Sequence, residues 1–226
     1  MPATPLTIDV SASSRVSSLL LAPDDASACY VLAHGAGAGM EHPFMTAIAA
    51  ALRERGIATL RYQFPYMEAR AKRPDPSAIA HAAVRAAVAE AARRLPNLPL
   101  IAGGKSFGGR MTSQAQAKAP MPGVRGLAFL GFPLHPPKAP GNERAAHLDD
   151  VQVPMLFLQG TRDELADLGL IRELAQRLGP GATLDIVDDA DHSFHVRKLS
   201  GREDAQVLEE LADSIAAWCR TLVTAT

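Results

Sequence analysis

Short apolar runs alternate with longer amphipathic segments from about residue 28 onward, a pattern typical of a mostly parallel sheet covered by helices. Glycine and proline punctuate the boundaries between the two kinds of segment. The expected strands are Cys29–Ala33, Ala58–Phe64, Leu98–Ala102, Leu127–Phe132, Met155–Gln159 and Leu184–Val187. The expected helices are Phe44–Arg55, Pro76–Leu95 with Asp75 as its N-cap, Ser106–Ala119, Leu165–Leu178 and Glu203–Val223.

The remaining segments add little to this pattern and do not divide it. Residues 6–22 are expected to form one or two antiparallel edge strands. The Pro-rich stretch 133–154 is the only long irregular region, and neither a repeat nor a linker splits the chain. We therefore expect a single α/β domain over residues 1–226, with a mostly parallel twisted sheet and helices on both faces.

Charge and cysteine content narrow the classes of partner. The formal net charge of the 226 residues is −1, so no overall field favours nucleic acid or an anionic membrane. The apolar run at 19–22 is too short to span a bilayer, and no basic segment precedes it. Cys29 and Cys219 are the only cysteines and are expected to be buried thiols. The chain is interpreted as soluble and cytoplasmic, and its oligomeric state is left open.

The stretch "AGGKSFGG" at 102–109 has two incompatible interpretations, a phosphate-binding loop or a turn that exposes a nucleophilic serine. A P-loop requires glycine five positions before Gly104, where Pro99 stands. In "HGAGAGMEHP", Met40 occupies a position where a dinucleotide fingerprint requires glycine. A nucleotide cofactor is therefore not expected.

The nucleophile interpretation requires a strand, G-x-S-x-G and a helix in that order, and all three occur around Ser106. In the α/β-hydrolase arrangement an acid follows the second strand after the nucleophile, and a histidine follows the final strand. Asp163 and His192 stand in these two places. His192 would take the proton of Ser106 during attack, and Asp163 would hold the imidazole tautomer.

An oxyanion hole needs two preorganised N–H donors. The backbone N–H of Phe107 supplies one, and the "HGAGAG" turn supplies the other through Ala36 or, as the alternative, Gly37. His34 is expected to brace this turn. The metal-binding spacings H-E-x-x-H and C-x-x-C are absent from the sequence, so neither a metal nor another cofactor is expected.

Each of these roles has an alternative. Ser106 can be a helix N-cap and Asp163 the cap of the following helix. His42, Tyr66 and His135 are candidate substrate-binding residues, and Arg61 or His42 is a candidate for recognising a carboxylate. The remaining alternatives are competing acids at Asp188, Asp189 and Asp191, a competing base at His195, solvated loop positions at Glu41, His42 and His135, and exposed or salt-paired side chains at Lys105 and Arg110.

The motifs "HGAGAGM", "GGKSFGGRM", "FPLHPP" and "DADHSF" resemble the small predicted α/β-hydrolases related to the dienelactone hydrolases. That group includes the hydrolase-like domain of a subunit of the NSL histone-acetyltransferase complex. The resemblance covers about residues 30–220 and implies an α/β-hydrolase fold with Ser106, Asp163 and His192 as the triad. A non-catalytic interaction module is the alternative it also implies.

Many relatives insert a lid after the strand that follows the nucleophile, at the place that 133–154 occupies in this chain. A Pro-rich segment of this length is too short for a helical cap domain. We therefore expect an open, shallow site bounded by Phe64–Met67 and Pro133–Pro136, and a small or accessible ester or acyl substrate. The leading hypothesis is a carboxylesterase-like serine hydrolase that works through an acyl-enzyme, with perhydrolysis or lyase chemistry as a third possibility.

Overall fold

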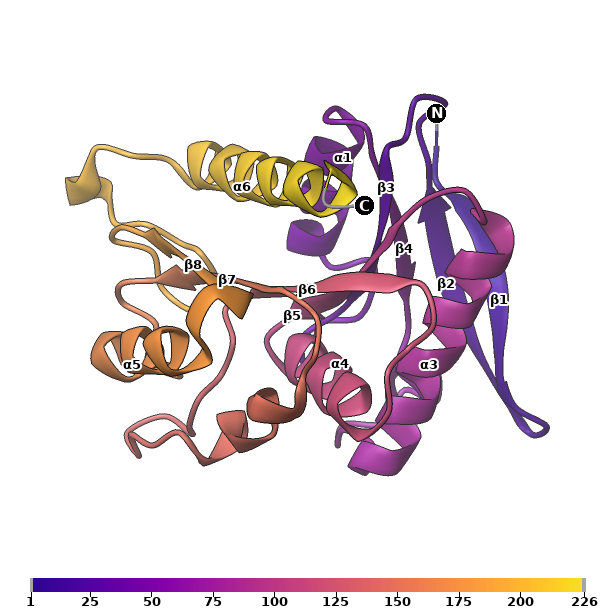
Figure 1. Cartoon of the computed structure of the whole chain (residues 1–226), viewed down its shortest axis with the longest axis horizontal. Coiled ribbons are helices and arrows are strands. Elements are labelled where there is room, and N and C mark those ends of the chain that lie inside the picture. The colour runs from indigo at the N-terminus through magenta and orange to yellow at the C-terminus, as the bar shows by residue number, and fades with distance from the viewer. Residues whose placement is uncertain (1, 225–226) are drawn as a thin grey trace.

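An eight-stranded sheet forms the centre of the molecule, in the order β1-β2-β4-β3-β5-β6-β7-β8 (Figure 1). The computed structural model describes residues 2–224. β1 pairs antiparallel with β2 and β2 antiparallel with β4, and every other neighbouring pair is parallel. The strands are β1 Thr4–Ser11, β2 Ser14–Leu21, β3 Ala28–Ala33, β4 Ile57–Tyr62, β5 Leu100–Lys105, β6 Val124–Leu130, β7 Met155–Gly160 and β8 Ala182–Val187.

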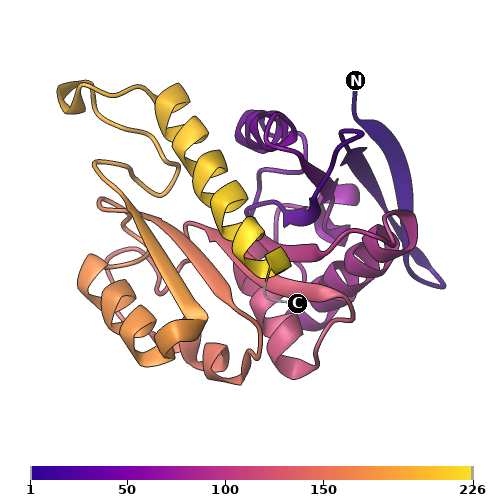
Figure 2. The same ribbon diagram turned by 45° about the horizontal axis from the view of Figure 1, so that its top comes forward.

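Helices cover both faces of the sheet, as the alternating pattern predicted (Figure 1). α1 (Pro43–Arg53) and α6 (Asp204–Thr224) pack side by side on one face, which Figure 2 also shows. α3 (Ser77–Arg94), α4 (Phe107–Lys118) and α5 (Leu168–Leu178) lie on the other. The short helix α2 (Pro65–Glu68) and the 3₁₀ segments η1 (Glu143–Asp150), η2 (Gly179–Gly181) and η3 (Lys198–Ser200) complete the chain.

Two apolar cores separate along the faces of the sheet because residues alternate between the faces of each strand. In β3, Val31 joins the core under α3 and α4, whereas Tyr30 and Leu32 join the core under α1 and α6. All six residues of β3 and of β4 are buried, so β3 reads as a continuous apolar run, whereas Thr59 and Arg61 interrupt the run in β4. The central strands are thus rigid supports for the loops at their carboxyl ends.

Most element boundaries differ from expectation by one to three residues, and three of these differences have a clear physical reason. β5 ends three residues later than predicted, because the glycines that suggested a turn continue the pairing with β3 as far as Gly104 and with β6 as far as Lys105. α3 has Pro76 at its N-cap position, and the carboxylate of Asp75 accepts the N–H of Tyr66 at 2.9 Å instead. α5 begins at Leu168 rather than at Leu165, and the carboxylate of Asp167 caps it by accepting the N–H groups of Gly169 and Leu170.

The stretch 133–154 is not wholly irregular. Its second half forms η1, which packs against α4 and places Ala145 and Leu148 in the core. The segment therefore packs beside α4 in the helical layer, and it does not form a helical cap over the carboxyl ends of the strands.

The two cysteines are buried free thiols, as predicted. Burial raises the pKa of both Cys29 and Cys219 to about 12, so neither is a thiolate at neutral pH. Within residues 2–224, none of the helices has the length and apolar content needed to cross a membrane.

Candidate active site

Ser106 occupies a sharp turn between β5 and α4, with φ 50° and ψ −114°. Close packing against β3 leaves no room for a side chain two positions before or two positions after Ser106. A Cβ on Gly104 would lie 2.2 Å from the carbonyl oxygen of Ala33, and one on Gly108 would lie 2.6 Å from that of His34. Ser106 stands at the N-cap position of α4, but its hydroxyl makes no capping hydrogen bond, so a role as a plain helix cap does not account for it. Ser106 is held in a strained conformation that exposes its hydroxyl.

Three side chains from different loops meet in hydrogen-bond sequence. The Nε2 atom of His192 lies 2.8 Å from Oγ of Ser106, and Nδ1 lies 2.7 Å from Oδ2 of Asp163. Because a carboxylate only accepts hydrogen bonds, Nδ1–H of the neutral ring donates to Asp163 and Nε2 is left to accept the serine proton. The sequence identified Ser106 by its G-x-S-x-G turn and the other two residues by chain order, and the structure brings the three side chains together.

Asp163 is fully enclosed and oriented by two further groups. Its Oδ1 accepts the N–H of Leu165 at 2.8 Å, and the amide of Gln159 donates to Oδ2, the oxygen that faces His192. Asp163 does not cap α5, because Asp167 does so. Gln159 was missed from the sequence, although an amide ending the apolar run "MLFLQ" was an available signal.

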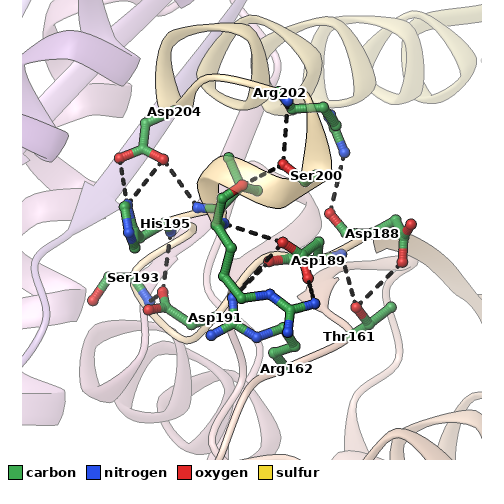
Figure 3. Close-up of polar contacts among 12 residues, drawn as sticks. Thr161, Arg162, Asp188, Asp189, Asp191, Ser193, His195, Ser200, Arg202 and Asp204 are labelled. Atoms are coloured by element: carbon green, nitrogen blue, oxygen red, sulfur yellow. Dashed lines mark hydrogen bonds and ion pairs between the residues drawn. The ribbon is translucent and has the colours of Figure 1, made fainter.

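The competing acids and base are engaged elsewhere. They stabilise the loop that follows β8 and carries His192 (Figure 3). Asp189 pairs with Arg197, Asp191 accepts two N–H groups of its own loop, and His195 pairs with Asp204 at 2.8 Å. Asp188 lies at the outer edge of the same network, 3.4 Å from the hydroxyl of Thr161. These residues support His192 rather than replace it or Asp163.

The candidate oxyanion donors lie on either side of Ser106. Phe107 opens α4, and Ala36 belongs to the turn after β3 that lines the same pocket. Within residues 2–224 neither N–H has a hydrogen-bond acceptor. The N–H of Gly37 differs, because it donates to the phenol oxygen of Tyr66 at 2.9 Å. Of the two candidates in the turn, Ala36 is thus the one with a free donor.

His34 braces this turn from below. Its Nε2 accepts the N–H of Phe64 at 3.1 Å, so Nδ1 carries the proton and donates to the carbonyl of Gly35 at 2.7 Å. Complete burial lowers the pKa of His34 to about 4 and keeps the ring neutral. A neutral ring in this place holds the chain at two points, which matches the bracing role expected for it.

Arg61 is buried and does not face the pocket, contrary to the suggestion that it recognises a carboxylate. Its guanidinium donates to the carbonyl of Met40 and to the hydroxyl of Thr46, both at 2.9 Å. Burial lowers its pKa, and Glu41 opposes this shift. Arg61 instead fixes the end of the glycine-rich turn to α1.

A pocket of about 350 Å³ opens above Ser106. His42 lies at its rim, but Tyr66 and His135 are not in its lining. Their polar atoms are occupied in the protein: Tyr66 bonds to the glycine-rich turn, and Nε2 of His135 accepts the N–H of Asp167 at 3.0 Å. The walls expected from Phe64–Met67 and Pro133–Pro136 are thus incorrect. The lining is Gly35, Ala36, Ala38, His42, Phe44, Met45, Lys105, Ser106, Leu165, His192 and Ser193.

Lys105 and Arg110, expected to be exposed or salt-paired, are neither. Lys105 is partly buried in the pocket wall, and its ammonium donates to the main-chain carbonyl of His192. Arg110 is partly buried on α4, and its Nε finds no hydrogen-bond partner among residues 2–224. Neither forms an ion pair with the residues that the structure describes. Between residues 2 and 224, no three histidine, cysteine, aspartate or glutamate side chains converge as metal ligands would.

The sequence and the fold were both compared with those of known proteins. A family model described as an alpha/beta hydrolase domain matches residues 26–220. An α/β serine hydrolase without a lid from Xanthomonas campestris is 22% identical and superimposes with a TM-score of 0.74, over 96% of this chain and 95% of that one. A dienelactone hydrolase from Anabaena variabilis is 21% identical, with a TM-score of 0.75 over 96% and 95%. The esterase domain of a Rhodothermus marinus protein is 19% identical, with a TM-score of 0.75 over 98% and 99%. These likenesses confirm the predicted fold.

Proposed function

This chain belongs to the α/β-hydrolase domain family, and on that premise we propose that it is a serine hydrolase that cleaves a small or accessible ester or related acyl bond. One observation carries the proposal. Ser106, His192 and Asp163 stand in hydrogen-bond sequence, at 2.8 Å and 2.7 Å, and Ser106 and His192 line a pocket. We further propose that residues 1–226 act as a single domain.

Ser106 is the nucleophile of the proposed reaction. As its Oγ bonds to the acyl carbon, Nε2 of His192 takes the hydroxyl proton and Asp163 stabilises the resulting imidazolium. Collapse of the tetrahedral intermediate breaks the bond to the leaving oxygen, which receives that proton from His192. Water then attacks the acyl-serine by the same proton path, which releases the acid and restores Ser106.

The oxyanion of each tetrahedral intermediate is assigned to the N–H groups of Phe107 and Ala36. Both donors belong to rigid backbone, since Phe107 begins α4 and the Ala36 turn is held by His34 and Arg61. Donors that are already oriented need no reorganisation as charge develops, which is the basis of their effect on rate.

The pocket favours a small substrate. Its volume of about 350 Å³ lies near the lower end of the ~300–1,000 Å³ range of small-molecule sites. Phe44, Met45 and Leu165 give it apolar walls, and His42 adds a polar group at the rim. The 133–154 segment packs beside α4 rather than forming a helical lid. The names of the structural neighbours, an esterase domain and a dienelactone hydrolase, support ester cleavage.

Labelling with a fluorophosphonate probe tests this function. The probe should modify Ser106 in the wild-type protein, and p-nitrophenyl acetate should compete with the probe for this serine. Ser106→Ala should lose both the labelling and the hydrolysis. Asp163→Asn leaves the shape intact but removes the charge that orients His192, so both rates should fall by roughly 10³- to 10⁴-fold. A folded wild-type protein that neither labels nor hydrolyses any ester of a short acyl panel would favour the non-catalytic module.

A further inference from the structure

Lys105 is a cation without a carboxylate partner in the wall of the candidate site. It stands between Gly104 and Ser106 in the chain, and its ammonium donates to the main-chain carbonyl of His192. The ammonium also lies 4.9 Å from the ring centroid of Phe194 and 5.9 Å from that of Phe44. None of the ion pairs among residues 2–224 includes it. Its contacts are therefore a carbonyl oxygen and two aromatic rings rather than a carboxylate.

These contacts connect the two sides of the site through one side chain. The residue next to the nucleophile holds the backbone of the base, across 87 positions of sequence. Phe194, two residues after His192, stacks on Phe44 of α1 with the ring planes 11° apart. The ammonium therefore fixes both the carbonyl of His192 and the aromatic ring that anchors its loop to α1.

The position of that backbone decides where the imidazole lies. The loop is tied to the protein on its outer side by the charged network of Figure 3. On the side of the loop that faces the pocket, the Lys105 ammonium contacts the main chain of His192 itself. Nε2 of the imidazole lies 2.8 Å from Oγ of Ser106. Proton transfer depends steeply on this distance, so even a small displacement of the imidazole would slow it.

We propose that Lys105 is a positioning residue, whose ammonium holds the main chain of His192 and the Phe194 ring so that the imidazole stays on the hydroxyl of Ser106. The inference rests on the proposed serine hydrolase function. It assigns Lys105 no contact with substrate and no part in bond making.

The charge of Lys105 makes the positioning dependent on pH. Burial lowers its pKa to about 8, against the opposing effect of Asp163 and Asp191. The titratable groups that face it are these two carboxylates, the imidazole of His192, and His42 across the pocket. The ammonium is charged below about pH 8 and is lost as the pH rises, so the hold on His192 weakens on the alkaline side.

Lys105→Met tests the inference, because it keeps the methylene stem and removes the charge. Lys118→Met, at the exposed end of α4, is the matched control. At pH 7, kcat for p-nitrophenyl acetate should fall about tenfold in Lys105→Met while KM stays unchanged. Wild type and the control should lose kcat as the pH rises through about 8, and Lys105→Met should lack this decline. Wild-type kcat with an unchanged alkaline decline in Lys105→Met would overturn the proposal.

A second measurement separates positioning from folding and from activity. Replacing an unpaired, partly buried cation by an apolar side chain among aromatic rings should leave thermal stability equal or higher. The Nδ1 proton resonance of His192 should be sharp in wild type at pH 7 and broadened in Lys105→Met. If wild type hydrolyses nothing but this resonance still responds to Lys105, the proposed function fails and the positioning role stands. If wild type is active and the resonance is unchanged in Lys105→Met, the positioning role fails.

Discussion

The nucleophile side and the base side of the candidate site are held in place by different forces. On the nucleophile side, β5 and α4 press against β3 so closely that backbone meets backbone around Gly104 and Gly108. On the base side, the loop after β8 is held by charged and polar side chains, with Asp189 bound to Arg197 and His195 bound to Asp204 (Figure 3).

The difference predicts which half of the site can be adjusted. Backbone contact in a sheet interior does not depend on pH or salt, and it tolerates almost no change of volume. Ion pairs at a surface are screened by salt and respond to pH, and each contributes little by itself. Substitutions should therefore act on the nucleophile side through folding and on the base side through graded losses of activity.

The largest effect is expected for Gly104→Ala. The added methyl would lie 2.2 Å from the carbonyl oxygen of Ala33, on a backbone with φ 148°. β3 and β5 would have to separate in the middle of the sheet, so we expect a loss of more than about 4 kcal/mol in the free energy of unfolding. Chemical denaturation measures it, with Gly181→Ala, where nothing lies within 4 Å, as the control. A stable variant with wild-type activity would show that the contact is not restrictive.

A smaller effect is expected for Asp189→Asn, on activity rather than folding. Asn accepts the positive φ of 55° at this position, but it removes the charge that binds Arg197. The loop should hold His192 less firmly, and kcat should fall by roughly three- to tenfold. High salt should narrow the difference from wild type, because it screens the same pair. Asp188→Asn, at an exposed neighbouring position, keeps the oxygen that faces the hydroxyl of Thr161 and should leave kcat unchanged.

The smallest effect is expected for Asp204→Asn. Asp204 raises the pKa of His195 above its usual 6.5. The ion pair is thus complete below about pH 6.5 and is lost as the pH rises through the raised pKa. The melting temperature should drop by at most about 2 °C. The drop should be larger at mildly acidic pH, where the pair is charged, than at alkaline pH. Asp24→Asn, at an exposed position, is the control for the loss of a carboxylate by itself. An equal drop at both would show that the pair contributes nothing.

Much of the fold was predictable because each element carries its own local signal. β3 is buried on both faces and reads as a continuous apolar run, and α1 begins at Pro43, where proline suits the first turn of a helix. Prediction failed at the boundaries where tertiary contact overrides a local rule. Gly103 and Gly104 suggest a turn in isolation, but the sheet extends them because its neighbouring strands approach too closely for side chains.

The candidate site divides in the same way. Ser106 was found from its G-x-S-x-G turn, and Asp163 and His192 were found from chain order, because loops at the carboxyl ends of parallel strands meet at one edge of the sheet. Tyr66 and His135 were assigned to the pocket from their places in loops, but both turn inward to bond backbone groups. Whether a loop side chain faces a pocket or the protein depends on packing that no short motif encodes.

The sequence by itself determined the order of strands and helices, the serine turn, and which acid and histidine follow the right strands, since these depend on local conformation and chain order. Only the tertiary structure decided which N–H groups of the glycine-rich turn stay free, how Gln159 faces Asp163, and where the charge of Lys105 lies. Such contacts join residues far apart in the chain. They exist only once the sheet has brought those residues to the same edge.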